Sequence, residues 1–400
     1  MRKCLSLLFL FLISNVFSQE NEYFIDANFD LNNRLVEIYQ TIDFTNTTSN
    51  SLNYIILNDW AHSYSNPKTP LGKRLSEDFT LNFQRSTKNQ RGFTNIIHIK
   101  SDSIILEHTR LKVNIDLVKV KLSNALKPNQ KIKINIKYKI KIPISDFTGY
   151  GIDKENNINL SEWFITLAKV VDNDWLIESN LDLNDNSLDP SFYKFKITYP
   201  LKFKLISDFK IDSVITSDTF KTLISEKEKR IYNPIIIANK KSFESFKLKN
   251  NTVITDIGNI KKNKTDSLIY KVISYVDNKT GNKLISKPDS NDSLNFDLIL
   301  NKTFNYVESK LGIYPINNMV LSKFNQDNDP VYGLNNIPEL LNPFDNTFIQ
   351  EFSVLKLVIS SYLNNLYPIH KRKNYWQLKG IEVFLLIDYI EKYYPELNLI

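Results

Sequence analysis

The segment from Thr347 to Pro395 constrains the fold most, because both of its halves have the pattern of an α-helix. In the first half, apolar residues recur every three or four positions and so lie on one helix face: Phe348, Phe352, Leu355, Ile359, Tyr362 and Leu366. Side-chain oxygens of residues 345–347 can accept hydrogen bonds from the first backbone N–H groups. The second half, from Trp376, is expected to end at Pro395. With a basic loop expected at His370–Lys373, the sequence predicts a helix–loop–helix unit.

This predicted unit contains few side chains of the kinds that bind transition metals. Between Asp345 and Glu382 the sequence has a single histidine, His370, and it falls in the predicted loop. Histidine, cysteine and carboxylate side chains are the usual protein ligands of zinc. We therefore expect that the two helices hold no zinc ion.

The pattern Trp376-x-x-x-Gly380, preceded by a long helix, resembles the zinc-binding core of the gluzincin metallopeptidases. The most similar family is that of the membrane alanine aminopeptidases. In that family an HExxH motif on the first helix supplies two histidine ligands and the catalytic glutamate, and a glutamate on the second helix completes the site. For a member with these residues, the resemblance implies a zinc cofactor and removal of N-terminal residues from peptides.

The residues of this chain at those family positions differ in kind. Alignment on the Trp-x-x-x-Gly pattern places Lys379 at the position of the second-helix glutamate. The family spacing then places Lys356 and Ser360 at the histidine positions and Leu357 at the catalytic glutamate position. A lysine ammonium has no free lone pair, leucine has no donor atom, and a serine hydroxyl is a poor zinc ligand. We expect neither metal ligands nor catalytic residues here, and instead expect Lys356 and Lys379 to form ion pairs with Glu351 and Glu382.

A third family element is also altered. Gly333-Leu334-Asn335-Asn336 resembles the family's Gly-x-Met-Glu motif, whose glutamate binds the free amino terminus of the substrate. Asn336 occupies the glutamate position, and its amide has no charge to pair with an ammonium. Gly333, Asn335 and Asn336 are therefore candidates for a degenerate substrate-binding motif. The joint loss of all three elements predicts a catalytically inactive relative.

The first part of the chain has the pattern of β-structure. Lys131–Ile142 alternates lysine or asparagine with apolar residues, as expected for a strand with one buried face. Shorter alternating runs flank the turn pair Asn32-Asn33 and include Tyr193–Tyr199. Leu57–Tyr64 and Ile142–Gly151 resemble segments of the family's N-terminal domain. Such a series of strands predicts a large antiparallel sandwich or saddle.

The fold class expected is therefore α+β. An N-terminal all-β domain over residues 19–232 precedes a gluzincin-like, thermolysin-like α+β domain over residues 233–400. A helix is expected at Ser290–Leu311 and a strand at Met319–Phe324. The second domain is expected to be incomplete, because the family's remaining catalytic helices have no counterpart before Ile400, and we expect a fragment of a longer protein.

Residues 1–18 have the pattern of a secretory signal peptide. Arg2 and Lys3 precede the mostly apolar run Leu5–Ile13, and small residues precede a cleavage site expected before Gln19. The only cysteine, Cys4, lies inside this segment, so the mature chain would have no disulfide bond. No second apolar run approaches the roughly 20 residues of a membrane-spanning helix. We expect an exported protein of the periplasm or cell surface.

Charge gives little support for a nucleic-acid partner. The chain has 51 Lys and Arg against 44 Asp and Glu, a net charge of +7. The lysines alternate with apolar residues along strands, which is typical of solvated faces. A peptide or protein partner is compatible with the sequence, and we expect no nucleic-acid partner.

Two other groups of side chains are of the kinds that bind metals. The four histidines, His62, His98, His108 and His370, do not have the spacing of metal ligands. The segment Asp172–Asp185 contains acidic and amide side chains at alternate positions, as in calcium loops. It lacks the glycine and the closing glutamate of an EF-hand, so calcium binding there remains open.

Three functions follow as hypotheses. The first is an exported aminopeptidase-like protein that has lost zinc-dependent activity and binds a peptide or a protein. The second is an active zinc aminopeptidase with other ligands. The third is a structural envelope or surface protein, for which Trp60, Trp163 and Trp175 would cluster in an exposed patch.

Overall fold

The computed structural model divides the chain into two compact units, which are described separately. It describes residues 20–182, 187–239, 243–249, 251–257, 296–331, 344, 346–366 and 371–397. The first unit comprises Met1–Pro143, Glu162–Leu201 and Ile211–Ile231, and the second comprises Ile144–Ser161, Lys202–Lys210 and Tyr232–Ile400. The second unit thus takes in two segments that a continuous boundary at residues 232–233 would assign to the N-terminal part. The proposed signal peptide lies outside the described residues.

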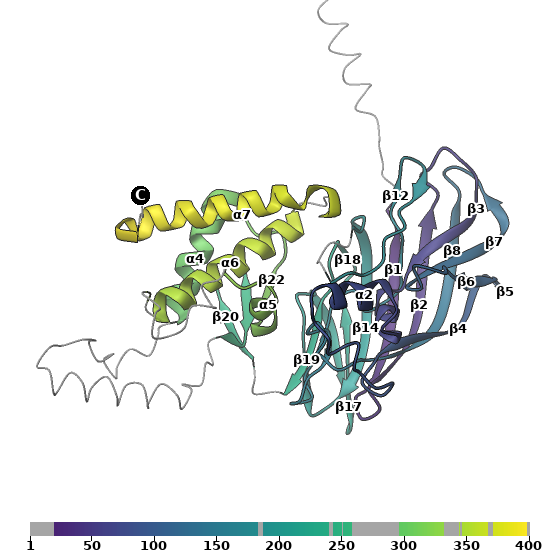
Figure 1. Ribbon diagram of the computed structural model, residues 1–400, viewed down its shortest axis with the longest axis horizontal. Helices are drawn as coiled ribbons and strands as arrows, with labels where there is room; N and C mark the ends of the chain where they lie inside the picture. Colours follow the sequence, from purple (N-terminus) through teal and green to yellow (C-terminus); the bar gives the residue numbers. More distant parts are fainter. Residues whose placement is uncertain are drawn as a thin grey trace, which may run out of the picture. The chain divides into compact units, whose positions relative to one another are not determined.

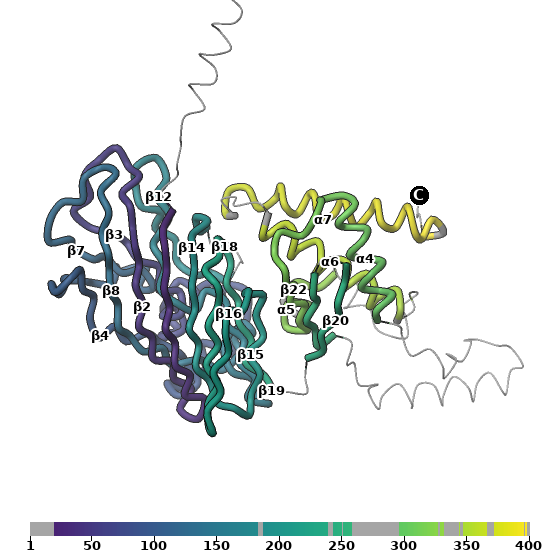
Figure 2. The backbone as a smooth tube through the Cα atoms, turned by 180° about the vertical axis from the view of Figure 1, so that it is seen from behind, coloured from purple at the N-terminus to yellow at the C-terminus, as the bar shows by residue number. Residues whose placement is uncertain are grey.

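A nine-stranded sheet forms the largest part of the first unit (Figure 1). Its strands are β1 (Glu22–Asp30), β2 (Leu35–Thr45), β4 (Phe93–Ser101), β5 (Ile104–Ile105), β8 (Lys131–Lys141), β14 (Ser191–Pro200), β16 (Ile211–Thr216), β17 (Phe220–Ser225) and β18 (Glu228–Arg230). Their order is β16-β17-β14-β1-β2-β8-β4-β5, with β18 also paired to β14. The central strands β14, β1, β2 and β8 run side by side in Figure 2 as well.

The alternation at Lys131–Ile142 is confirmed as a half-buried strand. In β8 the side chains of Ile134, Ile136, Tyr138 and Ile140 are buried, whereas most of the lysines between them reach solvent. Burying one face in this way stabilises the strand by roughly 2 kcal/mol for each large apolar side chain. β8 pairs with β2 along its whole length, from Lys131 opposite Thr45 to Lys141 opposite Leu35.

The sheet is mixed, and the prediction of an antiparallel sandwich or saddle is wrong at one strand pair. β1 and β14 run parallel, with Glu22 opposite Phe192 and Asn28 opposite Thr198. Parallel neighbours require a long crossover connection, and residues 31–190 between these strands provide one. Local alternation cannot indicate which distant strand will be the neighbour, so the sequence pattern did not reveal this pairing.

A smaller sheet completes the first unit. It contains β11 (Thr166–Leu167), β3 (Leu52–Asn58), β7 (Leu117–Leu126) and β6 (His108–Arg110) in that order, beside the hairpin of β12 (Val170–Val171) and β13 (Asp174–Trp175), the 3-10 helix η1 (Trp60–Ser65) and α2 (Pro70–Glu77). The hydroxyl of Tyr23 in β1 accepts from Leu167 N in β11, and that of Tyr138 in β8 accepts from Ile165 N. These bonds join the two sheets.

The described residues of the second unit form two small sheets and four α-helices. One sheet has the order β15 (Phe203–Ile206), β19 (Ile235–Asn239), β10 (Ile158–Leu160) and β9 (Gly151–Ile152), and the other the order β20 (Glu244–Lys247), β21 (Thr252–Thr255) and β22 (Asn318–Leu321). The helices are α4 (Phe296–Leu311), α5 (Lys323–Asn328), α6 (Asn346–Leu366) and α7 (Lys371–Tyr393), followed by the 3-10 turn η5 (Pro395–Leu397).

Gly149 shows why the segment Ile144–Ser161 belongs to this unit. It has a positive φ of 79°, and a Cβ added there would lie 2.0 Å from a ring carbon of Phe324 in α5. The absence of a side chain therefore allows both the left-handed backbone and the close approach.

The predicted helix pair is confirmed, with α6 covering the first half and α7 the second (Figure 1). Five members of the predicted stripe, from Phe348 to Tyr362, are buried. The predicted basic loop is partly wrong, because Lys371–Lys373 already belong to α7. Lys371, Arg372 and Lys373 carry neither a proline ring nor a β-branch, so nothing in them prevents an earlier start. His370 lies outside the described residues.

Two other predicted elements differ at their boundaries. The strand expected at Met319–Phe324 ends at Leu321, because the side chain of Ser322 accepts from Asn325 N and starts α5. The helix expected from Ser290 is described from Phe296, and it ends before Gly312, whose φ is 85°. In the described part of the chain, all helices are too short or too polar to cross a membrane.

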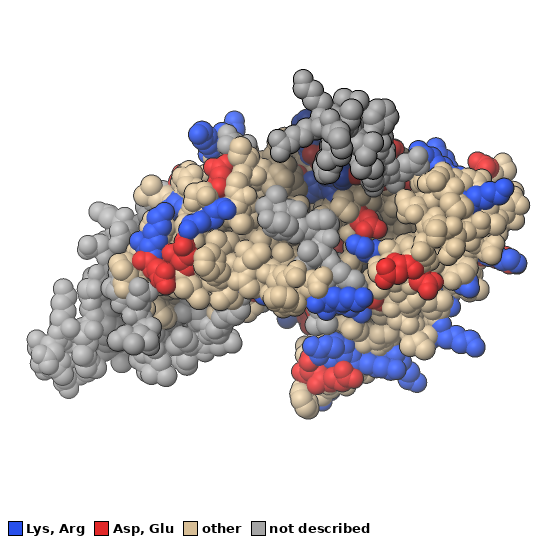
Figure 3. Space-filling model, turned by 90° about the horizontal axis from the view of Figure 1, so that it is seen from above, with Lys and Arg blue, Asp and Glu red and all other residues tan. Residues whose placement is uncertain are grey.

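Basic and acidic side chains are mixed on the surface shown in Figure 3. On that face the lysines and arginines lie among aspartates and glutamates, and ion pairs such as Lys310–Asp388 and Lys196–Asp26 occur in both units.

Candidate functional site

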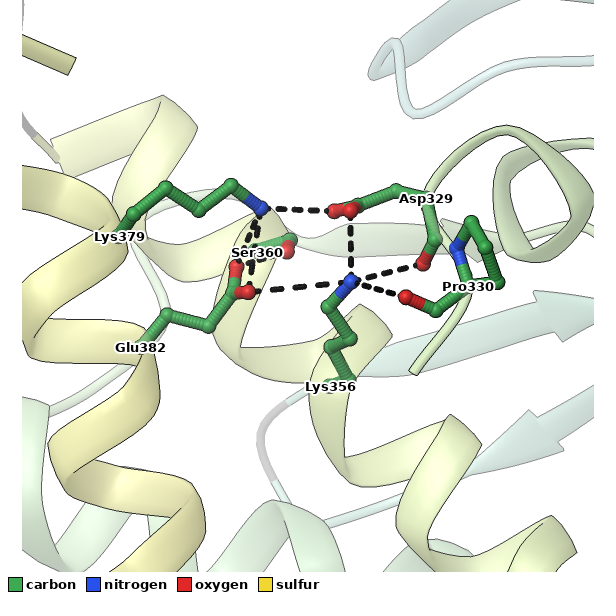
Figure 4. A network of polar contacts seen from close by, with 6 residues as sticks. All are labelled: Asp329, Pro330, Lys356, Ser360, Lys379 and Glu382. Carbon is green, nitrogen blue, oxygen red and sulfur yellow. Dashed lines mark hydrogen bonds and ion pairs between the residues drawn. The ribbon is translucent and has the colours of Figure 1, made fainter. Parts of the chain in front are cut away.

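Four side chains that the sequence singled out lie together between α6 and α7 (Figure 4). Lys356 and Ser360 are four residues apart on α6 and share one face of it, and Lys379 and Glu382 are three residues apart on α7. The fifth member, Asp329, follows α5 directly. The three positions that the resemblance assigned to zinc ligands therefore converge on one small region.

Lys356 is buried, with a side chain only 2% exposed. Its ammonium donates to Asp329 Oδ1 at 2.6 Å, to the Asp329 carbonyl oxygen at 2.9 Å and to the Pro330 carbonyl oxygen at 2.7 Å. Glu382 Oε1 is 3.9 Å away. An ammonium has three protons to donate, so these contacts satisfy the buried charge as burial requires.

Lys379 closes the cluster from α7. Its ammonium lies 2.9 Å from Asp329 Oδ2 and 3.0 Å from Glu382 Oε2. Ser360 Oγ donates to Glu382 Oε2 at 2.8 Å. We call Asp329, Lys356, Ser360, Lys379 and Glu382 the lysine–carboxylate network. Its two ammonium groups balance its two carboxylates, and it ties α6, α7 and the end of α5 together.

The charges of this network are mutually stabilised. Burial disfavours the charged form of Lys379, but the carboxylates of Glu382 and Asp329 and the nearby Tyr375 outweigh it and raise the pKa of Lys379. Burial likewise opposes ionisation of Asp329, yet hydrogen bonds from Lys356 and Lys379 lower the pKa of that carboxyl. Lys379 therefore stays protonated at neutral pH.

The residues present do not fit a zinc ion. A zinc ligand must offer a lone pair, and a protonated lysine has none. The two carboxylates that could coordinate a cation each already accept from the ammonium groups. Among the described residues, no group of three or more His, Cys, Asp or Glu side chains is arranged to hold a metal ion.

Leu357, which the resemblance assigns to the position of the catalytic glutamate, makes none of the polar contacts of this network. It is 6% exposed and belongs to the apolar core of the second unit. That core also contains Val354, Val358 and Tyr389. The position therefore contributes to packing and offers no group that could activate a water molecule.

The predicted role of Glu351 in this network is wrong. Its carboxylate accepts instead from Lys302 Nζ at 2.6 Å, Tyr389 OH at 2.5 Å and Tyr394 OH at 2.9 Å. The Lys302 ammonium also lies 4.7 Å from the centre of the Tyr394 ring, within the range of a cation–π contact. Glu351 and Lys356 are five residues apart, which separates them by about 140° around a helix and directs them to different partners.

Asp329 is the functional neighbour that sequence analysis missed. It precedes Lys356 by 27 residues and lies between a short helix and a proline, where no apolar period indicates its position. The candidate motif Gly333, Asn335 and Asn336 lies outside the described residues.

Two residues of the suggested calcium segment form a turn, and the three tryptophans differ in their degree of burial. Asp172 and Asn173 form the turn between β12 and β13 with φ values of 51° and 68°, and Asn173 Oδ1 accepts from Ser49 N. Residues 183–186 of the suggested calcium segment lie outside the described residues. Trp60 and Trp163 are buried and Trp175 is partly buried, which weighs against the hypothesis of a structural surface protein that would expose all three in one patch.

Among solved structures, the chain is similar in fold to M1 zinc metallopeptidases. The M1 zinc metallopeptidase of Deinococcus radiodurans matches with a TM-score of 0.53 and 11% identity, over 93% of this chain and 70% of that one. A mutant of the Deinococcus radiodurans enzyme bound to a Tyr-Ser-Ala substrate matches with a TM-score of 0.51 and 11% identity, over 94% and 72%. A mutant of a two-domain M1 zinc metallopeptidase bound to L-arginine matches with a TM-score of 0.52 and 10% identity, over 94% of this chain and 72% of that one.

The amino-acid sequence itself has no match of this kind. No protein-family model matches the chain, and no curated protein matches it. At about one residue in ten identical, the structural likeness concerns the fold. The chain has the mixed α+β, sheet-rich fold of the M1 metallopeptidases, with the lysine–carboxylate network between α6 and α7.

Proposed function

We propose that this protein is an exported, aminopeptidase-like protein that lacks zinc-dependent peptidase activity and acts by binding a peptide or a protein partner. The observation that supports this most is the lysine–carboxylate network. The positions that the family uses for zinc ligands carry Lys356, Ser360 and Lys379. Lys356 donates to Asp329 at 2.6 Å, and Ser360 and Lys379 donate to Glu382 at 2.8 and 3.0 Å.

The network gives a physical reason for inactivity. Metallopeptidases need a metal to polarise the scissile carbonyl and to lower the pKa of the attacking water. Here two ammonium groups and two carboxylates neutralise one another, and Leu357 is part of the apolar core. Rebuilding the site would require removal of hydrogen-bonded charges, among them the buried ammonium of Lys356, so a small shift of side chains would not restore it.

The binding role has a separate argument. The fold is similar to that of an enzyme solved with a Tyr-Ser-Ala substrate. Asn336, at the position where the family binds the amino terminus, carries no charge. A peptide ligand of this chain would therefore be held without a strong contact to a free N-terminal ammonium.

Two measurements on the purified mature chain test loss of activity. Elemental analysis should find far less than one zinc per chain, and an assay with aminoacyl arylamides should show no chelator-sensitive release of arylamine. An active M1 metallopeptidase assayed in parallel is the positive control. One zinc per chain together with chelator-sensitive turnover would overturn the proposal.

A second experiment tests the mode of binding. Titration calorimetry would compare peptides that begin with Tyr-Ser-Ala and carry either a free or an acetylated N-terminus. We expect both forms to bind within about a factor of two of each other, because the charged contact is missing. A preference of roughly tenfold or more for the free amino terminus would contradict this, since it would require a carboxylate at the amine site.

A further inference from the structure

One face of α7 is an apolar stripe that is exposed to solvent. The side chains of Trp376, Val383, Phe384 and Ile387 are 70, 38, 63 and 51% exposed. The opposite face carries the buried residues Leu378, Leu385, Leu386 and Tyr389, which pack into the core of the second unit. In Figure 1, α7 has α4 and α6 along one side. A helix that is apolar on both faces is typical of one with a partner on each.

The spacing of the stripe is that of a helix-pairing seam. Lys373, Trp376, Gly380, Val383 and Ile387 follow one another at steps of three, four, three and four residues. This repeat keeps a continuous line of side chains facing a second helix. Gly380 lies in the middle of the seam, and an added Cβ there would meet no atom within 4 Å. The seam therefore has a gap between two projecting aromatic residues, Trp376 and Phe384.

The ends of the seam carry opposite charges. Lys373 lies near the start of α7 and Glu391 near its end, and both are exposed on the same helix face as Gly380. If a second α7 ran antiparallel across the first, centred near residue 382, Lys373 of each copy would lie opposite Glu391 of the other. The same register would place each Phe384 opposite the gap at Gly380. A parallel pair would oppose like charges and leave two glycines facing each other.

We propose that α7 is a homodimer interface, in which two copies of this chain pair their α7 helices antiparallel in this register. Charge complementarity and the match between Phe384 and Gly380 both select a second copy over an unrelated partner. This interface is separate from the lysine–carboxylate network and does not depend on the function proposed above.

Analytical ultracentrifugation of the full chain tests the dimer. Its mass should rise from one chain to two with concentration, and Phe384→Asp should raise the dissociation constant at least about tenfold by placing a charge opposite Gly380 of the other copy. Leu298→Asp is the matched control, because Leu298 is 65% exposed on α4, outside the seam. A monomer at all concentrations, or equal effects of the two substitutions, would overturn the proposal.

A charge exchange and a cross-link test the antiparallel register without disturbing the core. Lys373→Glu and Glu391→Lys should each weaken the dimer, and the double variant should restore it. Because the only native cysteine is Cys4, Gly380→Cys chains mixed with Phe384→Cys chains should form a disulfide-linked heterodimer. Efficient linkage of Gly380→Cys chains to one another, or no recovery in the double variant, would rule out the antiparallel register.

Discussion

The ammonium of Lys356 lies 2.6 Å from Asp329 Oδ1 in the second unit, and Lys379 lies 2.9 Å from the other oxygen of the same carboxylate. One aspartate thus joins a lysine of α6 to a lysine of α7 (Figure 4). Both lysines stand at positions that the resemblance to the metallopeptidases assigns to zinc ligands. This relationship makes several measurable predictions.

Removal of the buried lysine should destabilise the second unit. Lys356→Met would leave Asp329 and Glu382 with one cation between them, and breaking a buried ion pair in this way costs about 3–5 kcal/mol. Hydrogen exchange of α6 amides, followed by mass spectrometry, would measure the change in opening free energy. Lys310→Met is the control, because Lys310 is 36% exposed in a surface pair with Asp388 that should contribute less than about 1 kcal/mol. Equal costs for the two substitutions would contradict the assigned roles.

Double-mutant cycles should separate the two ion-pair clusters of the second unit. Lys379 and Glu382 are 3.0 Å apart, so Lys379→Met and Glu382→Gln should couple by about 0.5–3 kcal/mol. Lys379 and Glu351 belong to different clusters, so Lys379→Met and Glu351→Gln should be additive within about 0.5 kcal/mol. Hydrogen exchange of α6 and α7 measures both cycles. Strong coupling of Lys379 to Glu351 would mean that the clusters form one network.

Restoring the family ligands should create a metal site. The variant Lys356→His, Ser360→His and Lys379→Glu removes both ammonium groups and places three ligand side chains, two histidines and one glutamate, where the present side chains converge. We expect about one zinc per chain by elemental analysis and a rise in melting temperature with added zinc. It should remain inactive as a peptidase, because Leu357 is still part of the core. Lys310→Glu serves as a surface control, and failure of the triple variant to retain zinc would mean that the side chains do not converge as described.

The parts of the fold that were predictable are those with a strong period. Because one face is buried, apolar residues alternate with polar ones in β8 and recur every three or four positions in α6. Both patterns can be recognised in the sequence. The convergence of Lys356, Ser360 and Lys379 followed from the family spacing. Asp329 was not predictable, because its position depends on how a short helix and its following residues pack against α6. The partners of Glu351 were also missed, because they come from α4 and from the end of α7.

The exposed face of α7 illustrates a different limit. Trp376 and Gly380 were informative as a motif, but a motif does not specify which of its residues will be buried. The structure buries Leu378 and leaves Trp376 exposed. Only the packing of α7 against its neighbours distinguishes the two faces, since both are apolar in sequence.

Acid should destabilise the first unit through His62. Burial lowers the pKa of this imidazole to about 4, and its Nδ1 lies 3.1 Å from both the backbone nitrogen and the carbonyl oxygen of Thr94. Asp59 favours and Arg110 opposes the charged form. Because the unfolded chain titrates at about 6.5, it binds more protons than the folded chain between pH 6.5 and 4. The contribution of His62 to the free energy of unfolding is therefore fully present above pH 6.5. It is lost as the pH falls from 6.5 to 4, and the loss amounts to up to about 3 kcal/mol.

Urea unfolding of the first unit at pH 7 and at pH 4.5 measures this loss. In His62→Gln the amide can keep the contact with Thr94 and does not titrate, so the variant should lose clearly less stability between these two pH values than the native protein. If both lose the same amount, protonation of His62 does not contribute to acid sensitivity, and the imidazole must be accessible to protons in the folded chain.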